Sequence, residues 1–239
     1  MKIAIISDIH GNLPALQSVL NDIKSKDINQ IYCLGDLVDF APWGNETIEL
    51  IRSRHIPCLL GNHDERIAFD QVIKPLSHQN EEETSARIKA INNSKKTITD
   101  LNKSFLAELP FSIRLKYQVG HSNWSILLVH AHPDSNDRYI FENEDENEFS
   151  ALLQKENIDC LIMGHTHLSY TRNINDKWIL NAGSVGRSRE KNRLASYLIL
   201  EINDSGIHPE IRKLAFDKSK VISSILDSEI PDFYAHFWE

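Results

Sequence analysis

KIAIISDIHGN, residues 2–12, joins an apolar run that is typical of a buried strand to two metal-ligating side chains, Asp8 and His10. Side chains two positions apart on an extended segment project to the same side, so both can reach one ion. Four further apolar runs each precede a similar cluster. The runs and clusters are 30–34 before GDLVD (35–39), 57–60 before GNHD (61–64), 126–129 before HAH (130–132) and 159–163 before GHTH (164–167).

These clusters contain the donor groups that bind borderline divalent transition metals: carboxylate oxygens, an amide oxygen and neutral imidazoles. Five clusters supply more ligands than one ion needs, so we expect a centre of two metal ions. Because each cluster follows a predicted strand, the centre should lie at the carboxyl edge of the sheet, where α/β proteins bind their ligands.

The spacing of apolar residues predicts an alternation of strands and helices in the first sixty residues. Segments 13–24 and 47–54 have helical spacing, with Asn12 placed to cap the first. With the strands around them they predict a mainly parallel first sheet. Beyond residue 110 the predicted strands lie too close together for helical crossovers, so the second half should be largely antiparallel. These strands are 111–117, 124–130, 160–163, 169–172, 178–181, 195–202 and 207–216.

Residues 65–110 interrupt the alternation and predict a helical insertion, which we call the cap insertion. Its apolar residues fall on roughly one helical face: Ile88, Ile91, Ile98, Leu101, Phe105 and Leu109. Since the insertion starts directly after GNHD, we expect it to cap the pocket beside that cluster. The acidic run 142–148 predicts the solvated start of another helix.

Composition limits the classes of protein that this chain can belong to. It has 239 residues and a formal net charge of −8, and no linker divides it, which favours one domain over 1–239 that contains the cap insertion. The acidic balance disfavours a broad nucleic-acid-binding face and attachment to an anionic membrane. Three cysteines within apolar runs, no signal segment and no spanning run predict a soluble, cytoplasmic protein. The aromatic tail after Pro231 either packs on the body or docks a second subunit of a homo-oligomer.

The order of the motifs resembles the calcineurin-like metallophosphoesterase superfamily. The resemblance runs from Asp8 to His167, and the strings SDIHGNL (7–13), LGDLVDFAP (34–42) and NAGSVG (181–186) are similar to its small bacterial phosphodiesterase and diadenosine-tetraphosphate-hydrolase-like branch. It implies an α/β fold of two packed mixed sheets flanked by helices, a four-layer α/β/β/α sandwich. Five motifs in the right order, each at a predicted strand end, make this resemblance specific.

The resemblance also implies the ligands of two divalent transition metal ions, with manganese the first choice among Mn, Fe, Zn, Ni and Co. One ion would be held by Asp8, His10, Asp36 and His167, and the other by Asp36, Asn62, His130 and His165, with Asp36 bridging. His63 matches the position of the general acid, and Asp64 follows where it can orient that imidazole. Asn62, His63 and Arg189 are the expected substrate contacts.

The expected reaction is hydrolysis of a phosphodiester or phosphomonoester bond in a small substrate such as a nucleotide. The metal centre reads the phosphoryl group and not its substituents, so a dinucleoside polyphosphate hydrolase and a phosphoprotein phosphatase remain alternatives. A retromer subunit that resembles this fold has lost catalytic residues, so a non-catalytic metal-binding interaction module is an alternative from another class. We expect the cap insertion to contact the part of the substrate outside the phosphoryl group and to select substrates by it.

For three sets of residues, two alternative roles remain open. Asp39 either orients a histidine or forms the turn after Gly35. His132 either contacts substrate or metal, or is a hydrogen-bonded structural imidazole. Arg187, Arg189 and Arg193 supply a phosphate clamp or are a solvated run of loop arginines.

Overall fold

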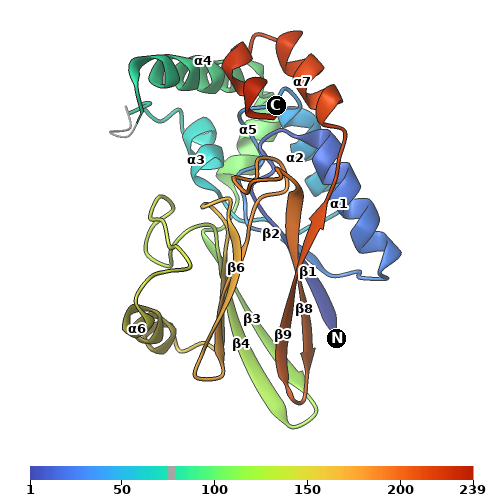
Figure 1. Ribbon diagram of the computed structural model, residues 1–239, viewed down its shortest axis with the longest axis vertical. Coiled ribbons are helices and arrows are strands. Elements are labelled where there is room, and N and C mark those ends of the chain that lie inside the picture. The colour runs from blue at the N-terminus through green and yellow to red at the C-terminus, as the bar shows by residue number, and fades with distance from the viewer. Residues whose placement is uncertain (75–78, 239) are drawn as a thin grey trace.

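The strands of the computed structural model, which describes residues 1–74 and 79–238, form two sheets packed face to face (Figure 1). The first sheet has the order β2 (Ile31–Cys33), β1 (Lys2–Ile6), β8 (Ala195–Asn203), β9 (Gly206–Leu214). The second has the order β3 (Ser112–Val119), β4 (Ser122–Val129), β5 (Cys160–Met163), β7 (Lys177–Ala182), β6 (Ser169–Ile174). Both sheets are mixed, which confirms the expected fold class.

The distribution of parallel and antiparallel pairs differs from the prediction. In the first sheet only β1 and β2 pair in parallel, because β8 returns from the far end of the sequence and pairs antiparallel with β1. In the second sheet β4, β5 and β7 are parallel neighbours. The step from β5 to β7 runs through β6, so a parallel pair forms here without a helical crossover. The rule based on strand spacing missed this route.

The predicted strand at 57–60 is also wrong. Only Cys58 pairs there, in an isolated parallel bridge with Cys33. The segment then turns at once into α3 (Asn62–Ala68), so the run is too short for a strand of its own.

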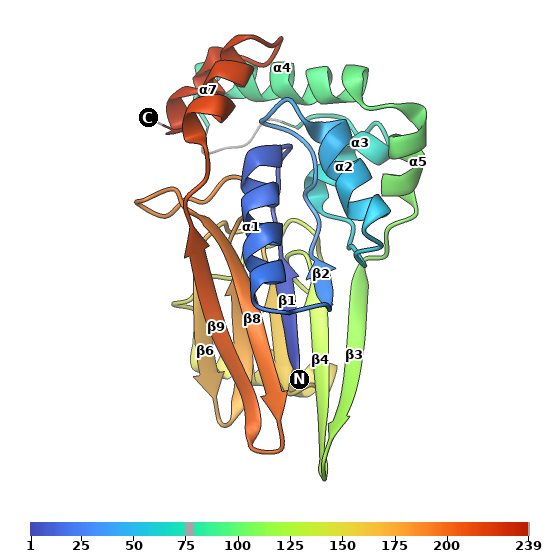
Figure 2. The same ribbon diagram turned by 90° about the vertical axis from the view of Figure 1, so that its right-hand side faces the viewer.

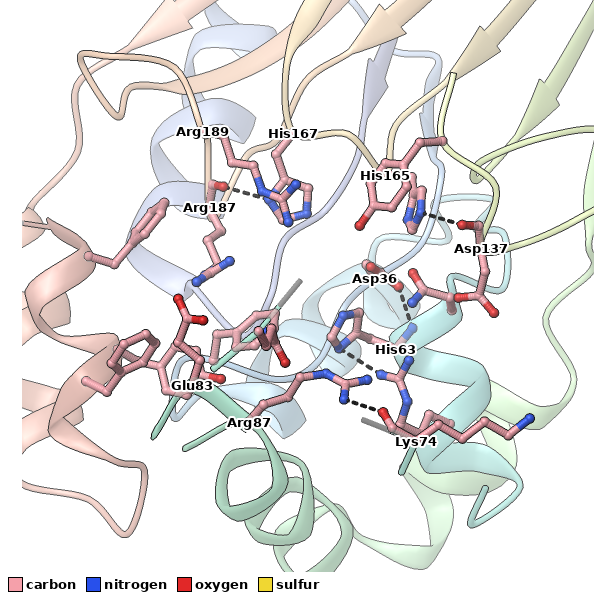
Figure 3. Close-up of a pocket in the computed structure, with 18 of the residues that line it drawn as sticks. Asp36, His63, Lys74, Glu83, Arg87, Asp137, His165, His167, Arg187 and Arg189 are labelled. Atoms are coloured by element: carbon pink, nitrogen blue, oxygen red, sulfur yellow. Dashed lines mark hydrogen bonds between the residues drawn. The ribbon is translucent and has the colours of Figure 1, made fainter. Parts of the chain in front are cut away.

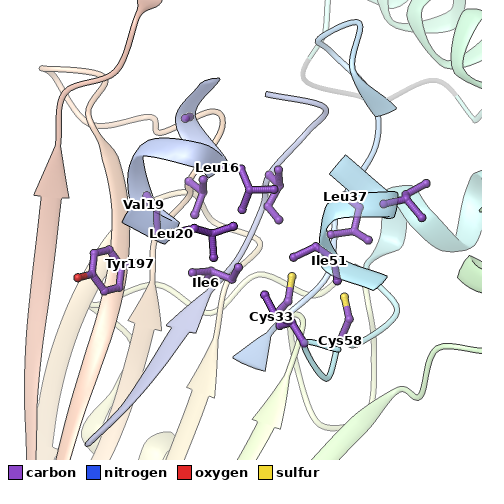
Figure 4. Close-up of a cluster of buried hydrophobic side chains, with 14 of the residues drawn as sticks. Ile6, Leu16, Val19, Leu20, Cys33, Leu37, Ile51, Cys58 and Tyr197 are labelled. Carbon is purple, nitrogen blue, oxygen red and sulfur yellow. The ribbon is translucent and has the colours of Figure 1, made fainter. Parts of the chain in front are cut away.

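Alternation along the strands separates the layers of the core. Ile3 and Ile5 of β1 lie between the two sheets, whereas Ala4 and Ile6 face the helices. Helices α1 (Leu13–Ser25) and α2 (Gly44–Ser53) cover the outer face of the first sheet, and Figure 4 shows α1 side chains packed against Ile6 and Tyr197. Helix α6 (Glu146–Glu156) covers the second sheet. The result is a four-layer α/β/β/α sandwich.

Helix α1 starts where the sequence predicts. The Asn12 side-chain oxygen accepts a hydrogen bond from the Ala15 amide at 3.1 Å, and Pro14 occupies the first turn. The chain therefore leaves the Asp8–His10 cluster directly into a capped helix. This fixes the start of the loop that carries the first two candidate ligands.

The cap insertion is helical, with α3 followed by α4 (Glu81–Thr97) and α5 (Asp100–Ala107). Its apolar residues do not form one continuous face, because Ile98 is extended and ends α4. Helix α5 then runs in a new direction and leaves Leu101 65% exposed. The prediction of a single face carries one helical period across this break and is wrong there.

A helical layer lies beyond the strand ends, where the clusters collect (Figures 1 and 2). It contains α4, α7 (Lys218–Leu226) and the turns η1 (Asp232–Tyr234) and η2 (His236–Trp238). Ala86 and Ala90 of α4 pack with Val221, Tyr234 and Trp238. The aromatic tail therefore packs on the body of its own chain.

The three cysteines are buried and free of disulfides, as expected for small apolar side chains. Within residues 1–74 and 79–238, none of the helices has the length and apolar character that crossing a membrane requires. The predicted helix after the acidic run is α6, which Asp145 caps by accepting a hydrogen bond from Asn147.

Candidate metal centre and active site

The clusters converge at the carboxyl ends of the central strands. Asp8 and His10 follow β1, Asp36 follows β2, His130 follows β4, and the GHTH cluster follows β5. Two groups of donor atoms each fall within 4.8 Å of one another: Asp8, His10, His167 and Asp8, Asp36, His130. In Figure 3, Asp36, His63, His165 and His167 surround the same cavity.

The backbone reaches this arrangement through left-handed conformations, not through the extended segment that we predicted. Asp8 and His10 have φ of 53° and 49°, and His165 and His167 have φ of 64° and 60°. Asp36 is also left-handed at 55°. Such conformations are unfavourable for residues with a Cβ atom and concentrate at functional sites. The side chains are thus turned into the site at the expense of backbone strain.

Three of the histidines have the same tautomer, because each ring Nδ1 meets a carbonyl oxygen that can only accept. The pairs are His10 with Val38 (3.0 Å), His130 with Leu34 (3.0 Å) and His167 with Arg187 (2.7 Å). With Nδ1 as donor, the lone pair of each Nε2 points into the site. The Nε2 atoms of His10 and His167 lie 3.1 Å apart, so two acceptors face each other with no proton between them.

The Asp8 carboxylate adds a further acceptor to this group. Its Oδ2 accepts hydrogen bonds from Ser7 Oγ at 2.6 Å and from the His165 amide at 2.9 Å. Its Oδ1 is buried without a hydrogen-bond partner, 3.2 Å from His167 Nε2. An orphaned carboxylate oxygen beside two imidazole lone pairs fits a bound cation. A Cβ at Gly164 would come within 2.3 Å of Oδ2, so only glycine fits there.

Asp36 belongs to the second donor group and also approaches the first, whereas Asp8 is common to both. Its Oδ1 accepts from the His63 amide at 2.8 Å, and its Oδ2 lies 3.4 Å from His130 Nε2 and 3.7 Å from His10 Nε2. Burial and the nearby Asp8 charge raise the pKa of Asp36 well above its usual range. Two neighbouring buried carboxylates repel each other unless positive charge lies between them.

Two further expected ligands, Asn62 and His165, have their own contacts around the donor groups. Asn62 Oδ1 lies 3.0 Å from His130 Nε2. His165 Nε2 donates to the Asp137 carbonyl at 3.3 Å, and its ring stacks on Tyr139 with the centroids 4.2 Å apart. His165 thus stands outside both donor groups, although its Nδ1 is left as the free ring nitrogen.

The structure changes the expected partner of His63. The carboxylate that contacts its Nδ1 belongs to Asp39, with Oδ2 2.6 Å away, and Asp39 is buried. Asp64, which we expected to orient this imidazole, instead accepts hydrogen bonds from the amides of Asp36, Leu37 and Gly61. Asp64 points back into the protein because it occupies the N3 position of α3, where carboxylates cap the helix start. It ties the GNHD turn to the GDLVD turn.

His132 lies apart from the cavity with the candidate ligands. Its Nδ1 accepts a hydrogen bond from the Asp134 amide at 3.0 Å, and it lines a separate hollow beside α6. This is the structural reading of the two that the sequence left open.

The cavity above the donor groups measures about 700 Å³, and it is cationic although the chain is acidic. The three arginines after the glycine turn line it, together with Arg66 and Arg87 and the tail aromatics Phe233, Tyr234 and Phe237. The sequence analysis did not identify Arg66, Arg87 or the aromatic wall. Arg66 stands three residues after His63, a helical spacing that could have suggested it, but nothing local marks Arg87.

Arg187 connects the metal site to the tail. Its carbonyl oxygen accepts from His167, and its guanidinium lies 4.3 Å from the Phe40 ring centroid and 4.4 Å from that of Phe237. Arg193 lies 4.0 Å from the Phe237 centroid on the same wall. Burial lowers the pKa of Arg187 to about 10. Cation–π contacts of Arg187 and Arg193 with Phe237 therefore hold the tail against the cavity wall.

A calcineurin-like phosphoesterase superfamily model matches residues 1–205. The chain belongs to this superfamily. It is 31% identical over 248 residues to the uncharacterized protein MJ0912 of Methanocaldococcus jannaschii, covering 97% of this chain and 94% of that protein.

Solved structures of low sequence identity share the fold of this phosphoesterase-superfamily chain. Protein PH1004 of Pyrococcus horikoshii OT3 superposes with a TM-score of 0.83 at 17% identity, over 99% of this chain and 97% of that one. A metallophosphoesterase from Sphaerobacter thermophilus superposes with a TM-score of 0.76 at 22% identity, over 100% and 98%.

The buried imidazoles of the metal-free superfamily chain should contribute stability that is lost on acidification. Burial lowers the pKa of His10, His63 and His167, and it lowers that of His165 to about 3. The unfolded chain protonates such imidazoles near a pKa of about 6.5, so it binds more protons than the folded chain below that pH. Their contribution is complete above about pH 6.5 and is lost toward pH 3. Burial raises the pKa of Asp36, which acts in the opposite direction, so a comparison of two proteins isolates the imidazole contribution. Between pH 7 and 5, the increase in the free energy of unfolding with pH, measured by urea unfolding, should be smaller by about one proton in His167→Asn than in the parent protein. Equal slopes would contradict it.

Proposed function

We propose that this chain is a hydrolase of phosphoric esters that works with two divalent transition metal ions, manganese being the first choice. The observation that carries the proposal is the set of acceptor atoms turned toward one another: the Nε2 lone pairs of His10 and His167 and the orphaned Asp8 Oδ1. Asp36, Asn62, His130 and His165 complete the proposed ligand set. Membership of a phosphoesterase superfamily supports the same chemistry.

When bound, two such ions supply an activated water and neutralise phosphoryl oxygens. The residues of the chain do the remaining work. His63 lines the cavity and acts in its doubly protonated form: Nδ1–H donates to Asp39, whose carboxylate stabilises the imidazolium, and the Nε2 proton passes to the leaving oxygen. Asp39 fixes the ring orientation. The cap insertion and the tail limit access of water from above.

The substrate we propose is a small phosphodiester or phosphomonoester, such as a nucleotide. A cavity of about 700 Å³ walled by the cap insertion and the tail suits a small molecule. Its cations favour an anion, and its aromatic wall favours a planar group. Arg189 is exposed at the rim and suits a first contact with the phosphate. The buried, free cysteines are compatible with action in the reducing cytoplasm.

The proposal is tested by turnover and metal content measured together. We expect the chelated protein to be inactive on bis(p-nitrophenyl) phosphate and manganese to restore hydrolysis with about two ions per chain. A panel of cyclic nucleotides, dinucleoside polyphosphates, phosphomonoesters and phosphopeptides would then rank the substrate classes. Two bound ions without turnover on any member would instead support a non-catalytic metal-binding module.

A further inference from the structure

Two arginines in the cavity wall are buried without an anionic partner. Arg66 of α3 is 9% exposed and Arg87 of α4 is 6% exposed. Among the residues that the structure describes, no carboxylate oxygen lies within 4.0 Å of either guanidinium group. Buried cations are costly unless an anion or a full set of acceptors compensates them. Both side chains line the cavity, so an anion entering it can reach them.

In the described part of the chain, the Arg66 guanidinium has one close polar neighbour, and that neighbour is not an acceptor. Its Nη1 lies 3.2 Å from His63 Nδ1. That ring nitrogen also lies 2.6 Å from Asp39 Oδ2, so it carries the proton and donates it to the carboxylate. An N–H that faces another N–H makes no hydrogen bond. The guanidinium of Arg66 therefore keeps its donors for something that the cavity receives.

Within residues 1–74 and 79–238, the Arg87 side chain makes one hydrogen bond. Its Nη1 donates to the Lys74 carbonyl at 2.9 Å, as Figure 3 shows, and this hydrogen bond holds the Arg87 side chain in the cavity wall. Burial and the nearby charge of Arg66 lower the pKa of Arg87, which reflects two cations that share one environment. Lys74 adds a third positive charge to the same wall.

The position of this pair relative to the metal site decides which part of a substrate it would meet. His63 lies between them, with its ring centroid 5.0 Å from that of His10 on one side and its Nδ1 beside Arg66 on the other. Since His63 is proposed to act on the leaving oxygen, a group near the arginines belongs to the leaving group. The reacting phosphoryl group is held on the opposite side, at the donor atoms.

We propose that Arg66 and Arg87 form a second anion-binding subsite, which takes a phosphate or carboxylate carried by the leaving group of the substrate. The subsite stands on the geometry of the two arginines alone, whereas its assignment to the leaving group rests on the proposed function. It narrows the substrate class to phosphoesters with a further anionic group beyond the scissile bond. Guanidinium groups suit this role because they bind oxyanions through paired donors.

Binding of inorganic phosphate and inorganic pyrophosphate to the metal-free protein, measured by calorimetry, tests the subsite without turnover. We expect Arg87→Gln to weaken binding about tenfold to a hundredfold, the range for a hydrogen bond to a charged group. Arg87→Lys should recover part of the loss. Arg172→Gln is the matched control, because Arg172 lies on β6, where it stacks over Phe149 of α6 and does not line this cavity. Thermal unfolding of each variant checks that it is folded.

A pair of substrates tests the assignment to the leaving group. The ratio of kcat/KM for a carboxyl-substituted p-nitrophenyl phosphate to that for p-nitrophenyl phosphate should fall about tenfold or more in Arg87→Gln and stay constant in Arg172→Gln. Absent anion binding in the parent protein, or equal binding in Arg87→Gln, would overturn the subsite. An unchanged ratio would overturn the leaving-group assignment. Anion binding that depends on Arg87, in a protein that hydrolyses nothing, would keep the subsite and remove the proposed function.

Discussion

Asp36→Asn should abolish turnover and reduce bound metal. Asp36 is a buried member of the second donor group, and its Oδ2 lies near an imidazole nitrogen of each group, that of His10 and that of His130. A neutral amide supplies one oxygen without charge, and its NH₂ cannot act as a ligand. Removing a residue that hydrogen-bonds to a metal ligand typically lowers metal affinity or activity about 10–100-fold. Removing a direct bridging ligand should lower both by more. Metal content and kcat/KM, measured on the same sample, check the result.

Asp134→Asn is the matched control for this variant. Asp134 is an exposed aspartate that pairs with Lys155, and it should keep both properties. Undiminished turnover with full metal content in Asp36→Asn would end the two-metal assignment. Loss of folding is checked by thermal unfolding, because the Asp36 amide and carboxylate also join the GDLVD and GNHD turns.

His63→Ala should keep the metal and lose rate by about 10²–10⁴, the usual contribution of a general acid. Its ring is held by Asp39, and it lines the cavity and belongs to neither donor group. The loss should shrink for a substrate that releases p-nitrophenolate, whose leaving oxygen needs no proton. Rates on p-nitrophenyl and alkyl phosphates, with metal analysis, measure both effects.

The Asp39→Asn variant separates positioning from proton transfer. We expect it to retain metal, lose less rate than His63→Ala and change the pH profile of kcat, since the amide no longer stabilises a protonated imidazole. Metal loss in His63→Ala equal to that in His10→Ala would assign His63 to the ligands instead. A rate loss of the same size on every leaving group would remove its role as acid.

The sequence predicted the donor groups because their signal is local. Each cluster sits directly after an apolar run, so its position at a strand end needs no knowledge of the rest of the fold. The same reasoning failed where the partner is distant in sequence. Nothing near β1 shows that β8 pairs with it, so the parallel character of the first sheet was overestimated.

The partner of His63 shows the same limit at the scale of single residues. Asp64 is adjacent in sequence and was chosen for that reason, but the first turn of α3 directs it toward backbone amides. Asp39 comes from another loop and reaches the ring because its backbone is left-handed, with φ of 72°. Side-chain direction at a helix start depends on the helix geometry, which spacing alone does not give.

The aromatic tail lies beyond residue 205, where the family model ends, yet Phe233, Tyr234 and Phe237 form part of the cavity wall. The metal donors all lie within the matched region. One part of the cavity wall thus lies outside the matched region, whereas the proposed ligands and the two arginines of the proposed anion subsite lie within it. We expect substitutions in the tail to change selectivity while the proposed ligand set stays intact. Activity toward a new phosphoester is accordingly best sought by varying residues 231–238 and not the five clusters.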